Sequence, residues 1–177
     1  QINQGQTQLT LSNRVVQLDG LHVERDEGDM DGRIHLDFEN EIVVKVNVPE
    51  VLRADLARPK WKSEHVALGT NTDPYQPLER ELKITRRLLE VLRDYRHPFS
   101  IVTKSALVLR DLDILQSMAE RGLVKVALSV TTLDRNLARA MEPRASTPDK
   151  RLEAVETLAK AGIPTSVMVA PVVPGLT

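Results

Sequence analysis

The stretch His-Val-Ala-Leu-Gly-Thr-Asn-Thr-Asp-Pro-Tyr-Gln-Pro (residues 65–77) decides the fold. A short apolar run, 65–68, is followed at once by small polar and acidic side chains and then by a strongly periodic helical segment. This order is typical of the point where a strand of a parallel sheet passes to its helix, and βα architectures bind their ligands at that edge. Asx turns and helix N-caps use the same residue types, so turn chemistry alone is the alternative interpretation.

The same alternation continues along the rest of the chain. We expect strands near residues 43–48, 65–69, 99–103, 124–130 and 165–170. We expect helices over about 50–56, 78–95, 111–122, 133–141 and 147–162, with Asp111 capping the third. Repeats of about thirty residues predict an α/β fold with a parallel sheet and helices on its outer face. Because no helix follows the last strand, the prediction is a partial (β/α) barrel that is incomplete at both ends.

Residues 1–40 differ from the remainder and form a polar N-terminal segment, so the predicted domains are 1–40 and 41–177. Two alternating runs, 8–11 and 15–18, predict a hairpin that turns at Ser12-Asn13. The stretch 26–32 is interpreted as a solvated acidic loop. Its acid spacing loosely resembles a calcium loop, but the terminal Glu of such loops is misplaced.

Composition limits the classes of function. The chain has 177 residues, the expected size of one domain, and 24 basic against 25 acidic residues, which argues against a nucleic-acid partner. Aromatic residues make up only 3%, too few for platforms that stack single strands. The chain has no membrane-length apolar run and no signal-peptide pattern, so we expect a cytoplasmic protein without a membrane partner. It contains no Cys, which excludes disulfides and thiolate ligands within it.

Polar side chains follow three consecutive predicted strands. The ends of parallel strands lie side by side, so these residues predict one site for a small molecule with a carboxylate, an ammonium group and a ribose. The predicted cofactor-binding residues are Thr70, Asn71, Thr72, Asp73, Lys104, Ser129 and Thr131. Lys104 has two further interpretations, a Schiff-base lysine and a solvated strand end. The four histidines show no metal-ligand spacing, and no catalytic residue or metal ligand is assigned.

In combination, six stretches resemble the radical SAM superfamily, specifically its branch near spore photoproduct lyase. They are 42–47, 69–76, 103–112, 129–134, 142–144 with 151–154, and 162–164 with 167–171. The resemblance implies a partial (β/α)6 barrel that binds S-adenosylmethionine at the carboxyl ends of its strands. It places Asn71, Lys104 and Ser129 against the methionine end or the ribose of that cofactor. It also implies an electron donor as partner of a full-length member.

The chain departs from this family in one respect. In the family, a Cys-x-x-x-Cys-x-x-Cys loop carries a 4Fe–4S cluster just upstream of the match at residues 37–39. Here that place holds residues 15–34, without a Cys. We therefore expect this chain alone to bind no iron and to lack the reductive cleavage of S-adenosylmethionine that yields the 5′-deoxyadenosyl radical. The sequence is then either a fragment or spliced version of a full enzyme, or a diverged relic.

Three hypotheses about function are open. The first is a radical SAM protein whose activity belongs to the full-length chain, with unknown substrate. The second is a non-catalytic small-molecule-binding or scaffold domain derived from that fold. The third is a lyase that forms a Schiff base on Lys104. Anaerobic iron reconstitution separates the first two, and borohydride trapping tests the third.

Overall fold

The computed structural model describes residues 8–12, 15–23, 30–37 and 42–177. The chain divides into two compact units, residues 1–61 and 62–177. Within the described ranges, no helix combines the length and the apolar character needed to cross a bilayer. The predicted division at residues 40 and 41 stays a prediction.

The first unit contains an antiparallel sheet of four strands in sequence order, followed by one helix. The strands are β1 (Gln8–Ser12), β2 (Val15–Val23), β3 (Met30–Asp37) and β4 (Ile42–Lys45), and the helix is α1 (Val48–Leu56). The predicted hairpin is confirmed, because β1 pairs antiparallel with β2, but Ser12 is not part of its turn: it is paired with Val15 as the last residue of β1, and Asn13 lies outside the described residues. The helix expected from residue 50 is confirmed as well, with Pro49 in its first turn, where a missing N–H costs nothing.

Two predictions in this unit are wrong. Residues 30–32 of the expected acidic loop lie in β3, where Met30 is paired with Val23; the rest of that loop lies outside the described residues. Antiparallel pairing provides hydrogen bonds to the backbone N–H and C=O groups whatever the polarity of the side chains. Polar residues such as these can therefore form a strand. Residues 43–48 are not a strand of the parallel sheet, because β4 pairs antiparallel with β3 and ends at Lys45. A short β-branched run indicates a strand but does not identify its partner.

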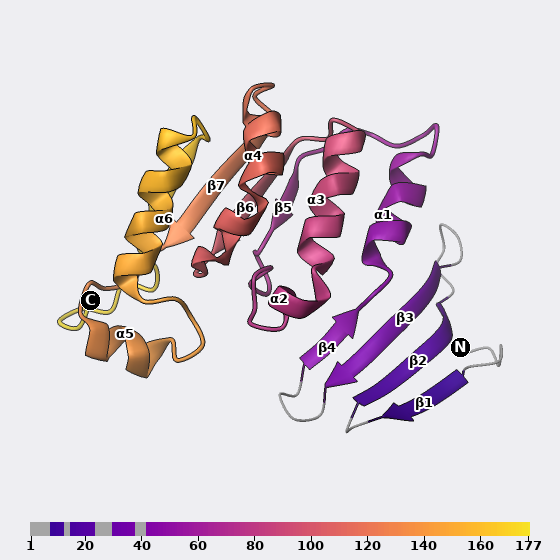
Figure 1. Cartoon of the computed structure of the whole chain (residues 1–177), viewed down its shortest axis with the longest axis horizontal. Helices are drawn as coiled ribbons and strands as arrows, with labels where there is room; N and C mark the ends of the chain where they lie inside the picture. The colour runs from indigo at the N-terminus through magenta and orange to yellow at the C-terminus, as the bar shows by residue number, and fades with distance from the viewer. Residues whose placement is uncertain (1–7, 13–14, 24–29, 38–41) are drawn as a thin grey trace. The chain divides into compact units, whose positions relative to one another are not determined.

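The second unit contains the predicted parallel sheet, in the order β5-β6-β7-β8. Its strands are β5 (Val66–Leu68), β6 (Phe99–Thr103), β7 (Val124–Ser129) and β8 (Thr165–Met168). The helices α3 (Ile84–Asp94), α4 (Leu112–Ala119) and α6 (Pro148–Lys160) lie in a row over one face of this sheet (Figure 1). This arrangement confirms the α/β class and is that of a partial (β/α) barrel.

The core of the second unit lies between the sheet and these helices. Alternate residues of β6 and β7 face it, and they are met by the apolar stripes of the three helices. The most deeply buried apolar side chains include Leu89, Leu92, Phe99, Ile101, Leu115, Met118, Leu128 and Leu158. This core holds the carboxyl ends of the four strands in a fixed register, and the candidate site is built on those ends.

Two details of the helices differ from the prediction. The helix expected over 78–95 is broken into α2 (Glu79–Leu82) and α3, because Lys83 adopts a left-handed conformation with φ 52°. The Glu79 carboxylate accepts hydrogen bonds from the backbone N–H groups of Ile84 and Thr85, so it caps the start of α3. Asp111 does not cap α4 with its side chain; a 3₁₀ turn, η1 (Ala106–Asp111), precedes that helix.

Candidate functional site

The loop that leaves β5 begins at a position that only glycine can occupy. Gly69 has φ +94°, and a Cβ atom placed there would lie 2.0 Å from the carbonyl oxygen of Val102 in β6. The absence of a side chain therefore lets the loop turn closely over the end of the neighbouring strand. Residues 70–72 of this loop are exposed to solvent, and Asp73 is half-buried.

Asp73 joins the ends of the first two parallel strands. Its Oδ1 accepts hydrogen bonds from the backbone N–H of Tyr75 at 2.9 Å and from the hydroxyl of Thr103 at 2.7 Å. Its Oδ2 accepts a hydrogen bond from the backbone N–H of Lys104 at 2.7 Å. One carboxylate thus fixes the loop after β5 against the last residue of β6, and this orients the Lys104 side chain.

A cavity of about 400 Å³ lies at this edge of the sheet. Asp73 and Tyr75 line it from the loop after β5, Lys104 from the end of β6, and Met141 and Glu142 from the end of α5 (Arg135–Met141). The volume lies within the range of pockets that bind small molecules. The structure therefore brings Asp73 and Lys104, from the predicted set, to one cavity.

Lys104 is held by a carboxylate that the sequence did not assign to the site. Its Nζ lies 2.7 Å from Oε1 of Glu142, which also accepts a hydrogen bond from the hydroxyl of Thr131 at 2.7 Å. The other oxygen, Oε2, is 2.6 Å from Nη2 of Arg151, a fully buried guanidinium. Burial alone would raise the pKa of Glu142, but the hydrogen bonds from Lys104, Thr131 and Arg151 outweigh it and lower that pKa below its ordinary value.

Arg151 connects this carboxylate to the end of β7. Its Nε donates to the carbonyl of Ser146 at 2.6 Å and its Nη1 to the carbonyl of Ser129 at 2.8 Å. The hydroxyls of Ser129 and Thr131 are themselves buried against the carbonyl oxygen of Ala170. These two residues of the predicted set lie behind Glu142 and do not line the cavity.

The remaining predicted residues lie on the exposed part of the loop. Thr70, Asn71 and Thr72 are open to solvent and do not line the cavity. Their predicted contacts with a cofactor stay predictions. The ammonium of Lys104 pairs with Glu142, and the contact of Lys104 with Asp73 is made by its backbone N–H.

A buried polar cluster supports the cavity from the side of α4. The Tyr75 hydroxyl donates to Oδ2 of Asp111 at 3.0 Å, and Asp111 is fully buried. Arg86 and Arg110 approach the same carboxylate at 3.0 and 2.8 Å, and Arg110 also pairs with Glu79 at 2.9 Å. Burial, above all, raises the pKa of Tyr75, with the negative charge of Asp111 acting in the same direction. The cluster anchors the loop after β5 to the turn after β6.

The comparisons with known proteins agree with this architecture. The family model of the radical SAM superfamily matches residues 38–177, most of the chain. The chain belongs to the radical SAM superfamily. No solved structure matches it.

Its relatives include proteins described only as uncharacterised. One from Mycobacterium tuberculosis is 43% identical over 141 residues, covering 80% of this chain and 42% of its own length. One from Methanocaldococcus jannaschii is 33% identical over 135 residues, covering 76% and 49%. One from Acidianus two-tailed virus is 34% identical over 115 residues, covering 65% and 37%. The chain thus spans less than half the length of these relatives, and its likeness to spore photoproduct lyase stays a prediction.

The donor atoms of this radical SAM chain do not fit the family's iron–sulfur cluster. Such clusters are held by thiolates, and the sequence contains no Cys. Among the residues that the structure describes, no three His, Asp or Glu side chains converge as metal ligands either. The site can instead offer charge and hydrogen bonds, through one partly exposed ammonium at Lys104 and one carboxylate at Asp73.

Sequence reasoning missed Glu142 and Arg151 as parts of the site. Both stand in the stretches that carry the family resemblance, 142–144 and 151–154, but nothing in their spacing linked them to the strand ends. The signal that could have found them is an acidic residue and a basic residue placed nine positions apart across the start of a helix. A separation of nine residues does not by itself predict a contact, because Glu142 and Arg151 meet only when the loop before α6 is folded.

Proposed function

We propose that the cavity beside Lys104 holds the amino-acid end of S-adenosylmethionine, and that this chain is the cofactor-orienting part of a longer radical SAM protein. The observation that carries the proposal is the charge balance of the group formed by Lys104, Glu142 and Arg151. One carboxylate is shared by two cations, so the group has a net positive charge beside the cavity. Because the Asp73 carboxylate lines the same cavity, a ligand that carries both a carboxylate and an ammonium group matches the charges of the site.

Lys104 is the cation of this group that can turn to a ligand. An ammonium has three donors, and the structure assigns one of them to Glu142. Its side chain is 37% exposed, whereas that of Arg151 is 2% exposed and directs its donors to Glu142 and to two carbonyl groups. Lys104 can therefore bind a ligand carboxylate without giving up Glu142.

Asp73 offers the complementary charge. A carboxylate provides about four acceptor positions, and three are used by Tyr75, Thr103 and Lys104. A ligand ammonium in the same cavity has Asp73 as its acceptor. In this proposal Ser129 and Thr131 position Arg151 and Glu142 from behind.

The reductive cleavage of the cofactor is assigned to the longer protein, because this chain lacks the thiolates that the cluster requires. The bound cofactor supplies a 5′-deoxyadenosyl group to the family's radical chemistry. The residues described above orient its methionine end and exclude water from the Glu142–Arg151 pair, which is nearly inaccessible to solvent.

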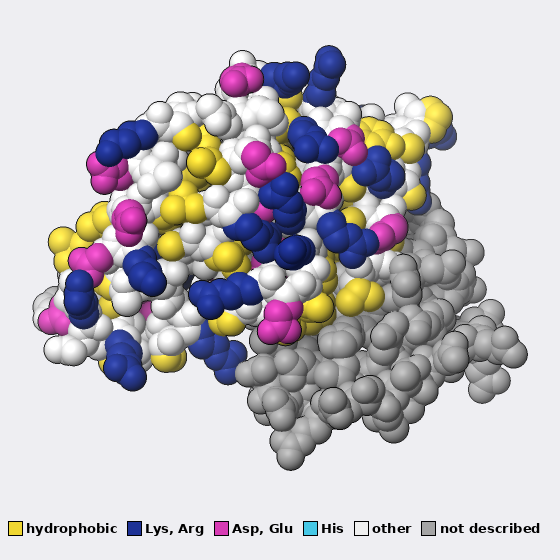
Figure 2. Space-filling model, viewed as in Figure 1, with side chains coloured by type: hydrophobic (Ala, Val, Ile, Leu, Met, Phe, Trp, Pro, Cys, Tyr) yellow, Lys and Arg dark blue, Asp and Glu magenta, His cyan; other side chains and the backbone are white. Residues whose placement is uncertain are grey.

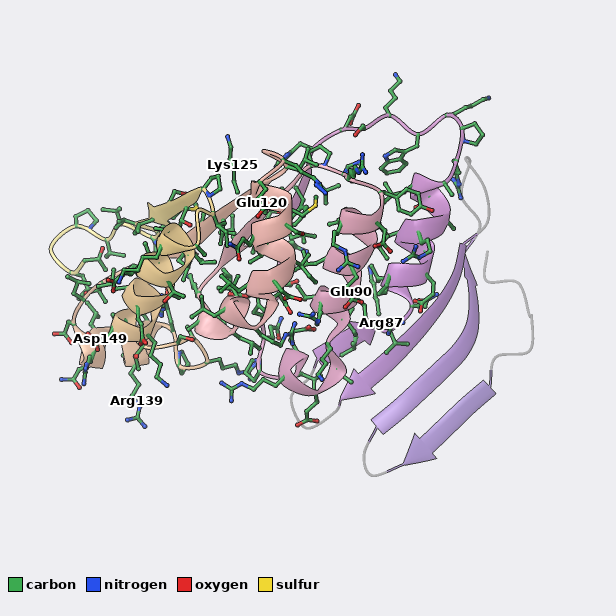
Figure 3. The ribbon with its side chains drawn as sticks, turned by 45° about the horizontal axis from the view of Figure 1, so that its top comes forward. Arg87, Glu90, Glu120, Lys125, Arg139 and Asp149 are labelled. Carbon is green, nitrogen blue, oxygen red and sulfur yellow. The ribbon has the colours of Figure 1, made fainter. Side chains whose placement is uncertain are left out.

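Calorimetric titration with S-adenosylmethionine tests the proposal. Without the cluster as an anchor we expect weak binding, with a Kd on the order of millimolar. Lys104→Ala removes a charge-assisted contact and should weaken binding roughly tenfold or more. Lys125→Ala is the matched control, because it removes an exposed Lys at the opposite, amino-terminal end of β7 (Figure 3). Equal affinity of the Lys104→Ala protein and the parent chain would show that Lys104 does not contact the ligand.

Anaerobic reconstitution with iron and sulfide tests the assignment of the cluster. We expect the chain to bind no iron, because it has no thiolates. A brown, iron-containing product with charge-transfer absorbance would contradict this. The Schiff-base hypothesis for Lys104 stays a prediction, which borohydride trapping with a carbonyl compound tests.

A further inference from the structure

A second cavity, of about 430 Å³, adjoins the first and has a different character. The two share part of their walls, at Tyr75, Ser105 and Arg144 among others. The second cavity is lined by three cationic side chains, Arg80, Arg144 and Lys150, and by no carboxylate. It thus concentrates positive charge in a chain whose net charge is -1.

The three cations are not part of the ion-pair framework of the fold. Neighbouring guanidinium groups are paired: Arg86 and Arg110 with Asp111, and Arg151 with Glu142. No contact with a carboxylate is found for Arg80, Arg144 or Lys150 among the residues that the structure describes. Like charges around one hollow repel each other, and an anion between them removes that repulsion.

The hydroxyl groups of Ser105 and Ser146 also line the second cavity, and each can still donate its proton. Ser146 accepts a hydrogen bond from the backbone N–H of Ala106 at 2.9 Å, and Ser105 accepts one from that of Leu107 at 3.3 Å. Each acceptor role leaves the hydroxyl proton for another acceptor. The first turn of the 13-residue helix α6 also borders the cavity through Lys150 and adds the positive end of its dipole. The cations and hydroxyls carry the inference, and the helix end only adds to them.

We propose that this second cavity binds the phosphate group of a small phosphorylated compound. Arg80 and Arg144 suit the forked pairing of guanidinium with phosphate oxygens, and Lys150 supplies a compact point charge. Figure 2 shows Lys and Arg side chains interspersed with Asp and Glu side chains over the region where Figure 1 draws α3 and α4, so the proposal rests on the lining of the cavity and not on the charge of the whole face. This site adjoins the proposed S-adenosylmethionine site and shares Arg144 with it, but the proposal does not depend on S-adenosylmethionine binding.

A small phosphate ester fits these observations better than a nucleic-acid strand. The cations surround one hollow of limited volume, whereas a strand needs a charged track with stacking surfaces along it. The chain has few aromatic residues and nearly balanced charge, which argues against such a track. The cavity therefore suits a single phosphate or diphosphate group.

The proposal is tested by titrating the full chain with inorganic pyrophosphate at low ionic strength. Binding is monitored by ¹⁵N chemical shifts and by calorimetry. We expect saturable binding at one site, with the largest shifts at residues 105–107 and 144–150. The double variant Arg144→Ala/Lys150→Ala should bind at least tenfold more weakly, and Arg80→Gln should also weaken binding. Lys125→Ala removes one positive charge, as Arg80→Gln does, but at the other end of the sheet, and it should bind like the parent chain. Should the double variant not fold, as judged by circular dichroism, Arg80→Gln decides alone.

Three outcomes would overturn the proposal. Binding that does not saturate, or that Lys125→Ala weakens as much as the cavity variants do, would show only diffuse attraction of anions. A single-stranded oligonucleotide that binds more tightly than pyrophosphate, with shifts extending over α3, would identify a nucleic-acid track instead. Loss of pyrophosphate binding in Lys104→Ala, with the double variant unaffected, would place the anion in the first cavity. Failure of S-adenosylmethionine binding alone leaves this site intact.

Discussion

Gly69 is the residue on which the geometry of the loop after β5 depends. Gly69→Ala would add both a Cβ atom 2.0 Å from a backbone oxygen and the strain of φ +94°. We expect the free energy of unfolding to fall by about 3 kcal/mol or more, measured by urea denaturation. Gly122→Ala is the matched control, because Gly122 has φ +69° but no atom within 4 Å of the added Cβ. It should lose only about 1 kcal/mol, and equal losses in the two variants would contradict the close approach.

Glu142 predicts a specific dependence of stability on pH. Its pKa is lowered in the folded state from the ordinary 4.5. Its contribution is therefore fully present above the unfolded-state pKa and is lost as the pH falls through the lower folded-state value. In Glu142→Gln, stability should fall by about 3 kcal/mol near neutral pH, because buried Arg151 loses its carboxylate, and the slope below pH 4.5 should become shallower.

The control for this experiment is Glu156→Gln. Glu156 also pairs with a cation, Lys160, but both side chains are exposed, at 63% and 73%. Solvent screens such a pair, so this variant should leave the stability near neutral pH almost unchanged. A Glu142→Gln protein with the stability and the pH profile of this control would show that the buried pair contributes nothing to folding.

At the scale of elements, the cluster around Asp111 joins the loop after β5 to α3 and η1. Asp111→Ala leaves Arg86, Arg110 and the Tyr75 hydroxyl without their shared acceptor, and we expect a loss of about 3–5 kcal/mol in thermal or urea unfolding. Asp113→Ala is the matched control, since Asp113 pairs with the same Arg86 at 2.8 Å but is 61% exposed. It should cost less than about 1 kcal/mol, and similar losses in the two variants would contradict the structural role of the cluster.

The elements that the sequence predicted well are those that local patterns specify. The parallel strands at 65–69, 99–103 and 124–130 follow from apolar runs of strand length, and α6 from Thr147, Pro148 and the Gly162 that ends it. The break at Lys83 was missed because helical periodicity continues across it. It is visible only in the left-handed backbone of Lys83 and in the hydrogen bond that the Glu79 carboxylate accepts from the backbone N–H of Ile84, at the start of the next helix. The pairing of β4 with β3 depends on contacts distant in sequence, which no local pattern records.

The same limit applies to the candidate site: residues at strand ends could be predicted, and residues that distant packing brings there could not. Asp73 and Lys104 were found because each follows a strand, and the ends of parallel strands must meet. Glu142 was missed because it follows a helix, and the chain brings it to Lys104 only through the packing of α6. Ser129 ends β7 and Thr131 follows it, yet their hydroxyls are buried against Ala170, because the chain after β8 continues beside the end of β7.

At the scale of the whole molecule, every residue of the two cavities belongs to the unit of residues 62–177. The segment 57–65 that leads into this unit has no helix or strand and is exposed throughout. Exposed connections of this kind are the preferred sites of limited proteolysis. We therefore expect trypsin to cleave first at Lys60 or Lys62, both of them exposed.

Mass spectrometry of a brief digest should then show a fragment that begins at residue 61 or 63 and ends at the carboxyl terminus. The paired strands β6 and β7 should resist cleavage, because their backbone groups are engaged in the sheet and their core-facing side chains are buried. A first cut after Lys45 rather than after Lys60 or Lys62 would favour the division at residues 40 and 41 predicted from composition. A first cut after Lys104 or Lys125 would contradict the division at residues 61 and 62, since a compact unit does not open there before its exposed connection does.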